Sequence, residues 1–444
     1  MISKTINIRK GLDIPISGAA EKHVTDMRGI ATYAVKPIDF IGLTPRLLVT
    51  EGDKIAVGDA LFCDKNDERI RFTSPVGGVV KAVVRGEKRK LMEVVVESDG
   101  TQGEPVEQPE TAQEIKETML RCGLWTMMRQ RPFGTVAKPD EEPKAIFVSA
   151  FSSAPLSPDY DFVMQGREEF LKKGLEALSK LTKGPVHICF RPNQRLAEQL
   201  QTSNFKLQTH FVKGPHPSGN IGTQIAHIDP INKGEVVWTM NLQDVAVLGE
   251  LVSTGIYNPE KVIAVAGPNV ENPQYYRVKA GACLKDIKVK ENSRVISGDV
   301  LSGTQIAPDG FLGAYDDLVS VIPEGNYYDF MGWLMPGFKK FSFSRTFLSG
   351  YMPKLLNWKF DTNTHGDQRP LVFTGDFERV FPFDIYPTQL IKACVIGDID
   401  LMENLGIYEV EPEDFALCEF IDVSKTDIQQ IIRKALEKLR KEGI

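Results

Sequence analysis

The pattern of hydrophobic residues changes along this 444-residue chain, and that change limits the possible fold more than any other feature. Residues 1 to about 100 hold short alternating apolar runs separated by glycine, which is typical of small antiparallel strands and tight turns. From about 145 onward, apolar strands alternate with longer stretches of helical period, which indicates a second kind of domain. A chain of this length can form roughly three domains of ordinary size. The sequence therefore predicts a multidomain protein of mixed α/β and β structure.

The densest strand signals lie within residues 1–100. The letters SPVGG, from Ser74 to Gly78, predict a turn before two apolar runs, VVKAVV and LMEVVV, which can pair across a polar tip. This spacing resembles the barrel-sandwich fold of biotinyl and lipoyl carrier domains, and we expect that fold here. In a true carrier the modified residue would be Lys65, but the hairpin is too long for that role. We therefore expect an unmodified lysine on a loop.

A polar, acidic and proline-containing segment, TQGEPVEQPETAQ, occupies residues 101–113. Such backbone packs poorly, so we predict a linker here and expect it to be the preferred protease site.

Residues 114–267 are expected to form an open, Rossmann-like α/β domain. Its predicted strands are AIFVSAF, PVHICF, KLQTHFV, EVVWTM and, as a fifth strand, KVIAVAG. Between the first two, REEFLKKGLEALSKL places Phe170, Leu171, Leu175 and Leu178 at helical spacing with lysines opposite.

Short strands return in residues 268–325, where RVISGDVLSG brackets a tight turn in the manner of the β-grasp module called SLBB. Residues 326–444 are expected to be a helical C-terminal region. Its last helix should be capped by Ser424 and carry one apolar stripe, made of Ile428, Ile431, Ile432, Ala435, Leu436 and Leu439.

Charge and composition exclude several functions. The 53 basic and 59 acidic residues give a net charge of −6, so there is no positive field to gather nucleic acid. The chain shows neither a signal peptide nor an apolar run long enough to span a membrane. We therefore expect a cytoplasmic protein whose membrane role, if any, comes through a partner.

The order of these modules resembles two related groups. One comprises the flavin- and iron–sulfur-carrying NADH-oxidising subunits of respiratory complex I and of the Rnf complexes. The other is the A-subunit family of the bacterial Na+-translocating NADH:quinone oxidoreductase. Six sequence runs resemble the second group and make the resemblance specific: KGLDIPI, FTSPVGGVV, CGLWTMMRQRPF, GPHPSGNIGT, ISGDVLSGT and FMGWLMPGF.

This resemblance implies a peripheral subunit on the cytoplasmic face of the inner membrane, within a six-subunit complex. The complex passes electrons from NADH to quinone and exports sodium, and members of the resembled family are associated with the step from semiquinone to quinol. An integral membrane subunit is the expected partner. The alternatives are a purely structural scaffold within that complex and an Rnf-type electron-transfer subunit.

This sequence lacks the residues that form the cofactor sites of the flavin-carrying relatives. Where those relatives have small residues around flavin phosphate, the stretch from Gly123 to Gly134 carries Trp, Met and Arg. The C-terminal region has only Cys394 and Cys418, too few for the four ligands of an iron–sulfur cluster. We therefore expect no FMN, no cluster and no tightly bound cofactor, with ubiquinone or menaquinone as a possible substrate.

A quinone needs an apolar slot for its ring, a donor for each carbonyl oxygen and a cation near the developing anion. In the former flavin loop we expect Trp125 and Phe133 to form the slot and Arg129 or Arg131 to be the charged donor. His216, on the proline-flanked run 214–222, would be the second donor. The alternative is that these bulky residues only plug the vacated pocket.

Two other site types are disfavoured. The run 214–222 lacks the spacing and the lysine of a phosphate loop, so we expect a rigid turn. His187, His210, His216 and His227 lack metal-ligand spacing on a helix, so we expect no metal site and only scattered surface or loop histidines.

A surface for partner docking is predicted between 330 and 360, where aromatic and basic residues are mixed and no acidic residue occurs. The residues that we expect to dock a partner are Trp333, Lys339, Lys340, Phe343 and Arg345. The alternative is a core segment whose lysines reach the solvent.

Overall fold

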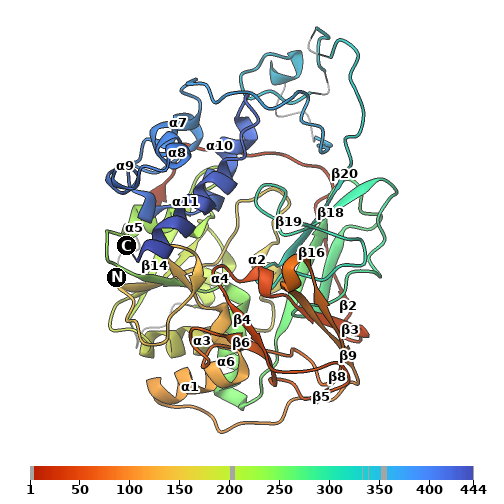
Figure 1. The fold of residues 1–444 in the computed structure, drawn as a ribbon, viewed down its shortest axis with the longest axis vertical. Helices are drawn as coiled ribbons and strands as arrows, with labels where there is room; N and C mark the ends of the chain where they lie inside the picture. Colours follow the sequence, from red (N-terminus) through yellow and green to blue (C-terminus); the bar gives the residue numbers. More distant parts are fainter. Residues whose placement is uncertain (1–4, 201–205, 333, 339, 352–357, 444) are drawn as a thin grey trace.

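A computed structural model describes residues 5–200, 206–332, 334–338, 340–351 and 358–443 (Figure 1). Two separate β-structures, one α/β sheet and a group of C-terminal helices make up the molecule. The mixed architecture that the sequence predicts is confirmed. Trp333 and Lys339, two of the residues expected to dock a partner, lie outside the described residues.

The barrel-sandwich is built by two small antiparallel sheets. One has the order β3 (Thr32–Val35), β9 (Leu91–Ser98), β8 (Gly78–Arg85) and β5 (Lys54–Ile55). The other has the order β4 (Pro45–Leu47), β6 (Ala60–Asp64) and β7 (Arg71–Thr73). The stacked rings of Phe62 and Phe72, with centroids 4.8 Å apart, fill its core. Lys65 is exposed on the loop after β6, as expected.

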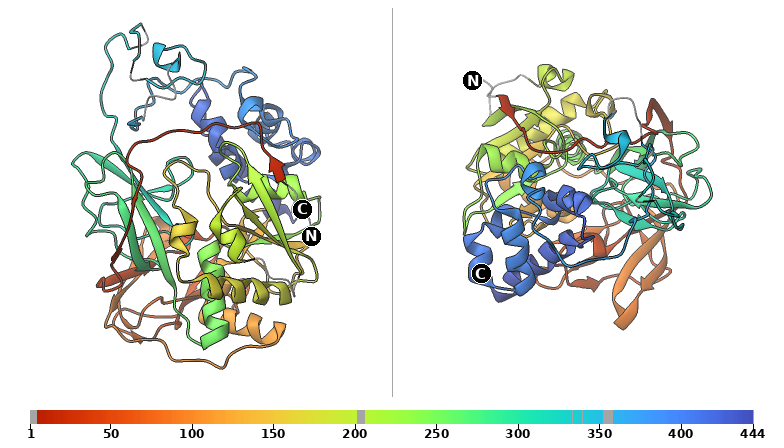
Figure 2. Two further views of the ribbon diagram at one scale, coloured as in Figure 1. Left: turned by 180° about the vertical axis from the view of Figure 1, so that it is seen from behind. Right: turned by 90° about the horizontal axis from the view of Figure 1, so that it is seen from above.

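The first two strands of the chain join other sheets. Strand β1 (Thr5–Asn7) runs parallel to β14 (Leu207–Lys213) of the α/β sheet. Strand β2 (Glu21–Asp26) runs parallel to β17 (Gln274–Lys279) of the second large sheet. The segment between them crosses from one sheet to the other and is coloured red in the left view of Figure 2. The N-terminal residues thus tie the two large sheets together.

The α/β sheet has seven strands in the order β1, β14, β13, β12, β15, β10 and β11. Strands β12 (Ala145–Ser149), β13 (Val186–Phe190) and β15 (Val237–Thr239) are parallel, whereas β10 (Arg129–Arg131) and β11 (Thr135–Val136) form an antiparallel edge. Alternate residues of β12 face different cores, since Ile146 and Val148 pack on one side of the sheet and Ala145 and Phe147 on the other. Both faces of the sheet are therefore covered.

The helices of this domain divide between those two faces. Helices α3 (Glu168–Lys180) and α6 (Leu242–Thr254) pack on the side of Ile146, and α5 (Ile221–Ile228) packs on the side of Phe147. A Cβ at Gly174 of α3 would lie 1.9 Å from the carbonyl oxygen of Val245, so glycine permits the close approach of α6. The remaining helices are α1 (Ala112–Cys122), α2 (Tyr160–Val163) and α4 (Arg195–Gln199).

The predicted linker leads directly into α1, whose capping box is formed by Thr111 and Glu114. Residues 101–110 contain no helix or strand. Val106 nevertheless donates its backbone N–H to the oxygen of Gly255, with a distance of 2.8 Å. Lys180 of α3 likewise donates to the oxygen of Glu110 at 2.8 Å. The segment is thus held against the α/β domain at Val106 and at Glu110, and its cleavage by protease stays a prediction.

The second large sheet contains a strand that the sequence pattern assigned elsewhere. Its order is β19 (Thr304–Ile306), β18 (Ser293–Ser297), β20 (Leu318–Pro323), β16 (Glu260–Ala266), β17 and β2. Strand β16, predicted as the fifth strand of the α/β sheet, instead runs parallel to β20 and antiparallel to β17. Every residue of β16 is buried, so its apolar run shows a strand but not the sheet to which it belongs.

The C-terminal helices form their own core beside the α/β domain (Figures 1 and 2). They are α7 (Phe377–Val380), α8 (Pro387–Ile396), α9 (Ile399–Asn404), α10 (Ala416–Ile421) and α11 (Ile428–Glu442). The apolar stripe of α11 is confirmed, although Ile431 is only half-buried. The predicted cap is wrong, because Asp427 accepts the N–H of Gln430 while Ser424 is buried and donates to the oxygen of Pro370.

Candidate functional site

A polar cavity of about 220 Å³ opens where the strands β12 and β15 end. Open α/β sheets place ligands at the carboxyl ends of their strands. Ser149 and Ser152 come from the end of β12, and Thr239 and Asn241 from the end of β15. Loops between strands of the second sheet, with Asp299, Leu301, Ser302 and residues 315–317, close the cavity together with Glu413 and Ala416 of the C-terminal part. Three parts of the chain therefore enclose one site.

Two helices begin at the wall of this cavity. Asn220 precedes α5 and Asn241 precedes α6, and both line the cavity. Neither asparagine side chain caps its helix. The first N–H groups of a helix carry a partial positive charge, so the wall favours an oxygen with developing negative charge.

Arg129 is the one arginine that lines the cavity among the residues that the structure describes. Its guanidinium lies over the ring of Tyr315, 4.9 Å from the centroid, and Tyr315 is fixed by a 2.8 Å hydrogen bond to the oxygen of Thr126. No ion pair or hydrogen bond from its guanidinium is found within the described part of the chain. Arg129 therefore presents free donors to a ligand.

His216 lines the same cavity and is only 3% exposed. Its backbone N–H donates to Asp13 of the N-terminal segment, at 2.9 Å, and its Nδ1 lies 3.1 Å from Ser153 Oγ. Because Ser153 Oγ accepts the Gly219 N–H, its own hydrogen can go to Nδ1, which leaves the proton of the ring on Nε2. Burial lowers the pKa of His216, against the opposing effect of Asp299 and Asp13. A neutral imidazole with one N–H donor results.

The other three residues predicted for a quinone site lie elsewhere. Trp125 is 1% exposed, packs edge-on against Trp238 at 5.4 Å and donates its Nε1–H to the oxygen of Ala137. Phe133 packs against Tyr408 of the C-terminal core, with centroids 6.2 Å apart. The expected aromatic slot is thus not formed by these two side chains, because Trp125 is enclosed by the large core and the half-buried Phe133 packs on the C-terminal core.

Arg131 does not line the cavity, and its side chain is only 3% exposed. Its guanidinium lies 2.5 Å from Glu413 Oε1 and 3.0 Å from Asp414 Oδ2, and its Nε lies 3.5 Å from Glu411. These carboxylates satisfy the guanidinium, so Arg131 has a structural role between the α/β domain and the C-terminal part.

The acidic residues and the two tyrosines of the cavity were not predicted from the sequence. They are Tyr160, Asp299, Tyr315, Asp316, Asp317 and Glu413. Tyr160 donates its O–H to Asp317, and Ser297 donates to Asp316 at 2.6 Å. Burial raises the pKa of Asp317 to about 6 and also raises that of Asp316. The adjacent Asp316 and Asp317, directly before the apolar run LVSVIP, are the signal that could have been noticed.

The prediction of scattered surface or loop histidines is wrong for His187 and His210, which lie on the paired strands β13 and β14. His187 is buried, its Nδ1 lies 2.9 Å from His210 Nε2, and its ring stacks on Phe147 at 4.4 Å. Adjacent parallel strands bring the two histidines together, which spacing along the chain does not reveal. Within the described ranges, no three His, Cys, Asp or Glu side chains are arranged to hold a metal ion.

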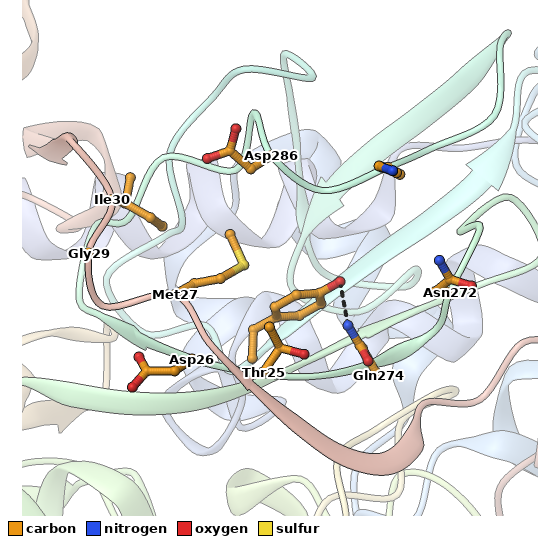
Figure 3. A pocket seen from close by; sticks show the side chains of 10 residues that line it. Thr25, Asp26, Met27, Gly29, Ile30, Asn272, Gln274 and Asp286 are labelled. Atoms are coloured by element: carbon orange, nitrogen blue, oxygen red, sulfur yellow. Dashed lines mark hydrogen bonds between the residues drawn. The ribbon is translucent and has the colours of Figure 1, made fainter.

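A larger hollow of about 530 Å³ lies at the outer edge of the second sheet (Figure 3). Asp26, Asp286 and Lys288 line it and are exposed, and Gln274 donates to Tyr276 at 2.9 Å. None of the predicted site residues is here. The charged groups of this hollow are solvated, so we place the candidate site in the smaller cavity.

The described docking residues have separate surroundings. Lys340 pairs with Asp329, and Phe343 is half-buried beneath the guanidinium of Arg379 at 4.4 Å. Arg345 is exposed. Neighbouring apolar side chains also face the solvent, with Tyr328 and Phe330 at least 90% exposed.

The fold and the cavity define a multidomain α/β protein with a barrel-sandwich before the α/β domain and an SLBB-type sheet after it. Three family models match along the chain: the NqrA N-terminal barrel-sandwich hybrid domain over 6–99, the NqrA second alpha/beta domain over 110–257 and the NQRA C-terminal domain over 262–307.

Full-length relatives agree with these models. The A-subunit of the Na(+)-translocating NADH-quinone reductase from Yersinia pestis bv. Antiqua (strain Angola) is 37% identical over 450 residues, which cover 99% of this chain and 100% of the relative. The proteins of the same name from Hahella chejuensis and Pasteurella multocida are each 38% identical with the same coverage. The chain belongs to the A-subunit family of the Na+-translocating NADH-quinone reductase. The Rnf-type alternative is therefore set aside.

Proposed function

We propose that this chain is a non-flavin, peripheral subunit of a six-subunit Na+-translocating NADH:quinone oxidoreductase. It takes part in the quinone-reducing step, from semiquinone to quinol, which is coupled to sodium export from the cytoplasm. The names of its relatives support the complex. The observation that carries the quinone step is the free guanidinium of Arg129 in a cavity that it shares with His216.

The cavity offers the groups that a quinone head group needs. Arg129 supplies a cation and His216 Nε2 a neutral donor, one for each carbonyl oxygen. The N-termini of α5 and α6 add partial positive charge where negative charge develops. An apolar part of the lining can contact the ring, and it comprises Phe151, Ile221, Met240, Leu242, Leu301 and Ala416. This set replaces the aromatic slot that the sequence predicted from Trp125 and Phe133.

The same lining supports the absence of FMN and iron–sulfur clusters. Among the described residues, Arg129 is the one arginine or lysine that lines the cavity, so a doubly charged flavin phosphate would have a single cationic side chain to bind it there. Trp125 and Met128 occupy the space of the former flavin loop as core side chains. Cys418 is fully buried and Cys394 half-buried, and they remain two thiols where a cluster needs four.

We further propose that the chain docks on an integral membrane partner at the cytoplasmic face of the inner membrane. In the described part of the chain no helix combines the length and the apolar character needed to cross a bilayer. The segment 328–345 exposes the apolar side chains of Tyr328, Phe330, Leu334 and Phe338 and the basic side chain of Arg345, a composition suited to such a partner. Phe343 and Lys340, which are bound within the chain, support this segment rather than face the partner.

The quinone step is tested with Arg129→Gln in the assembled complex. Quinone reduction should fall by at least about tenfold, because the cation that stabilises the anionic quinone is lost. NADH oxidation by an artificial acceptor should be unchanged. Arg121→Gln, at the exposed last turn of α1, is the matched control and should leave both rates unchanged.

Unchanged quinone reduction in Arg129→Gln would favour the second candidate, a purely structural scaffold. The buried ion cluster of Arg131 and the plugged loop around Trp125 are the observations that favour it.

A further inference from the structure

Reduction of a quinone consumes protons as well as electrons, and the charged donor of the cavity cannot supply them. Arginine stays protonated at every physiological pH, so Arg129 can stabilise an oxyanion but not neutralise it by transfer. A proton donor must therefore reach the same cavity. This requirement rests on the proposed quinone-reducing function.

Tyr160 and Asp317 meet the requirement by position. Both line the cavity, and the Tyr160 hydroxyl is hydrogen-bonded to Asp317 Oδ2. They come from different parts of the chain, Tyr160 from α2 and Asp317 from the loop that precedes β20. The pair therefore depends on the tertiary structure that also forms the cavity.

The surroundings hold Tyr160 in place. Asp159 caps α2, its backbone N–H donates to the hydroxyl of Tyr275 at 2.9 Å, and its carboxylate pairs with Lys22 at 2.5 Å. These contacts fix the first turn that carries Tyr160. The turn that carries Tyr160 is thus held to β17 through Tyr275 and to β2 through Lys22.

The charged groups near Asp317 also bear on its protonation. The hydrogen bond from Tyr160 and the charge of Lys261 favour its charged form, whereas Asp316 and Asp244 disfavour it. Lys261 is engaged by Asp244 at 3.3 Å and donates to the oxygen of Ala314 at 2.8 Å, so it does not pair with Asp317 directly. Desolvation dominates and raises the pKa of Asp317 to about 6, so the carboxyl takes up and releases protons within about one pH unit of 6. Desolvation and Asp317 raise the pKa of Tyr160, which keeps the phenol protonated.

We propose that Asp317 and Tyr160 form a proton relay to the quinone oxygen. A neutral semiquinone takes one electron, supplied by the oxidation of NADH in the complex, and becomes the quinol anion. When Asp317 is protonated, its O–H donates to the Tyr160 oxygen, and the Tyr160 O–H turns from Asp317 to the quinone oxygen. The Tyr160 O–H bond then breaks as an O–H bond forms on that quinone oxygen. The Asp317 O–H bond breaks as Tyr160 regains its hydrogen, and the carboxylate then takes a proton from water.

The test uses Tyr160→Phe and Asp317→Asn in the assembled complex. Both should lower the kcat of quinone reduction by at least about tenfold while changing the KM for quinone less than about twofold. Asp317→Asn should also remove the dependence of kcat on pH near 6. Asp317→Glu, which restores a carboxyl group, should recover part of the rate and of the pH dependence. Asp286→Asn, an exposed acid outside the cavity, is the control and should behave as the parent.

The outcomes separate the relay from the function on which it rests. If Arg129→Gln loses quinone reduction while Tyr160→Phe and Asp317→Asn keep the parental kcat and pH profile, the relay is overturned and the function stands. If all three variants reduce quinone at the parental rate, both are overturned. Tyr160→Phe keeps the aromatic ring and Asp317→Glu keeps the carboxyl group. These two variants therefore still test the relay if Asp317→Asn fails to fold.

Discussion

Arg129 and Arg131 lie two residues apart on one strand and have opposite surroundings. Residues i and i+2 of a strand point to the same face, so both guanidinium groups leave β10 on one side. Arg129 stacks on Tyr315 and faces the cavity, while Arg131 is enclosed by Glu411, Glu413 and Asp414. The strand directs both side chains to the same face. Of the two arginines, only Arg131 pairs with the segment 411–414, so they have different roles.

The difference follows from which carboxylates reach each arginine. The acidic segment 411–414 folds as a short helical turn against Arg131, and its Asp414 also accepts the backbone N–H of Glu411. Glu413 lies between the two environments, since it pairs with Arg131 and also lines the cavity. A buried charge is tolerated only when it is paired, whereas a charge that faces an open cavity can remain free for a ligand. Pairing therefore distinguishes the structural arginine from the binding one.

The largest effect is expected from Arg131→Leu. It leaves the three carboxylates without their cation, and removal of one partner from a buried ion pair costs about 3–5 kcal/mol of unfolding free energy. Arg129→Leu should cost less than about 1 kcal/mol, because no ion pair is lost. Urea denaturation of the full chain measures both. Equal losses in the two variants would contradict the comparison.

Trp125→Phe should have a smaller effect, on stability alone. The variant keeps an aromatic ring but loses the 2.8 Å hydrogen bond to the Ala137 oxygen, which costs about 1–3 kcal/mol when the acceptor stays buried. Quinone reduction by the assembled complex should stay at the parental rate, because Trp125 does not line the cavity. Loss of quinone affinity in a variant of normal stability would instead place Trp125 in the slot that its sequence position suggested.

The elements that sequence reasoning identified are those with a local pattern. The apolar residues Leu171, Leu175 and Leu178 repeat at helical spacing, and all three are buried in α3. The last helix, α11, was found by the same spacing, although its cap was placed three residues too early. Local periodicity thus predicted the helices themselves. It did not predict where a helix begins, because the capping residue depends on side-chain geometry.

The candidate site was only partly predictable, because its residues meet through tertiary structure. Arg129 and His216 were expected, yet the acids of the cavity come from other parts of the chain. Asp414 lies 283 residues beyond Arg131, and the residues around Arg131 in the sequence give no signal that the two will pair. The sheet of β16 was misjudged for the same reason, since a fully buried strand has no polar face to indicate its partner.

The smallest expected effect concerns the pH dependence of stability at the Arg131 cluster. Burial raises the pKa of Asp414 from its ordinary 3.8 to about 7, although Arg131 opposes the change. Between these values the folded chain holds a proton that the unfolded chain has released, so unfolding free energy falls as pH rises from about 4 to about 7. Asp414→Asn removes this titration while its side-chain oxygen can still accept from Arg131. The variant should therefore lose less stability across that window.

Glu413, whose pKa Arg131 lowers against the effect of burial, contributes stability that is lost only as pH falls below its ordinary 4.5, so it does not titrate across most of this window. We therefore expect the difference between parent and variant to change by at most about 1.4 kcal/mol per pH unit within the window. Asp39 and Asp317, whose pKa values burial raises to about 6, titrate in both proteins and cancel in the comparison. Urea midpoints of the two full chains at a series of pH values measure it, and parallel curves would show that Asp414 is ionised throughout, with Arg131 as its fully effective partner.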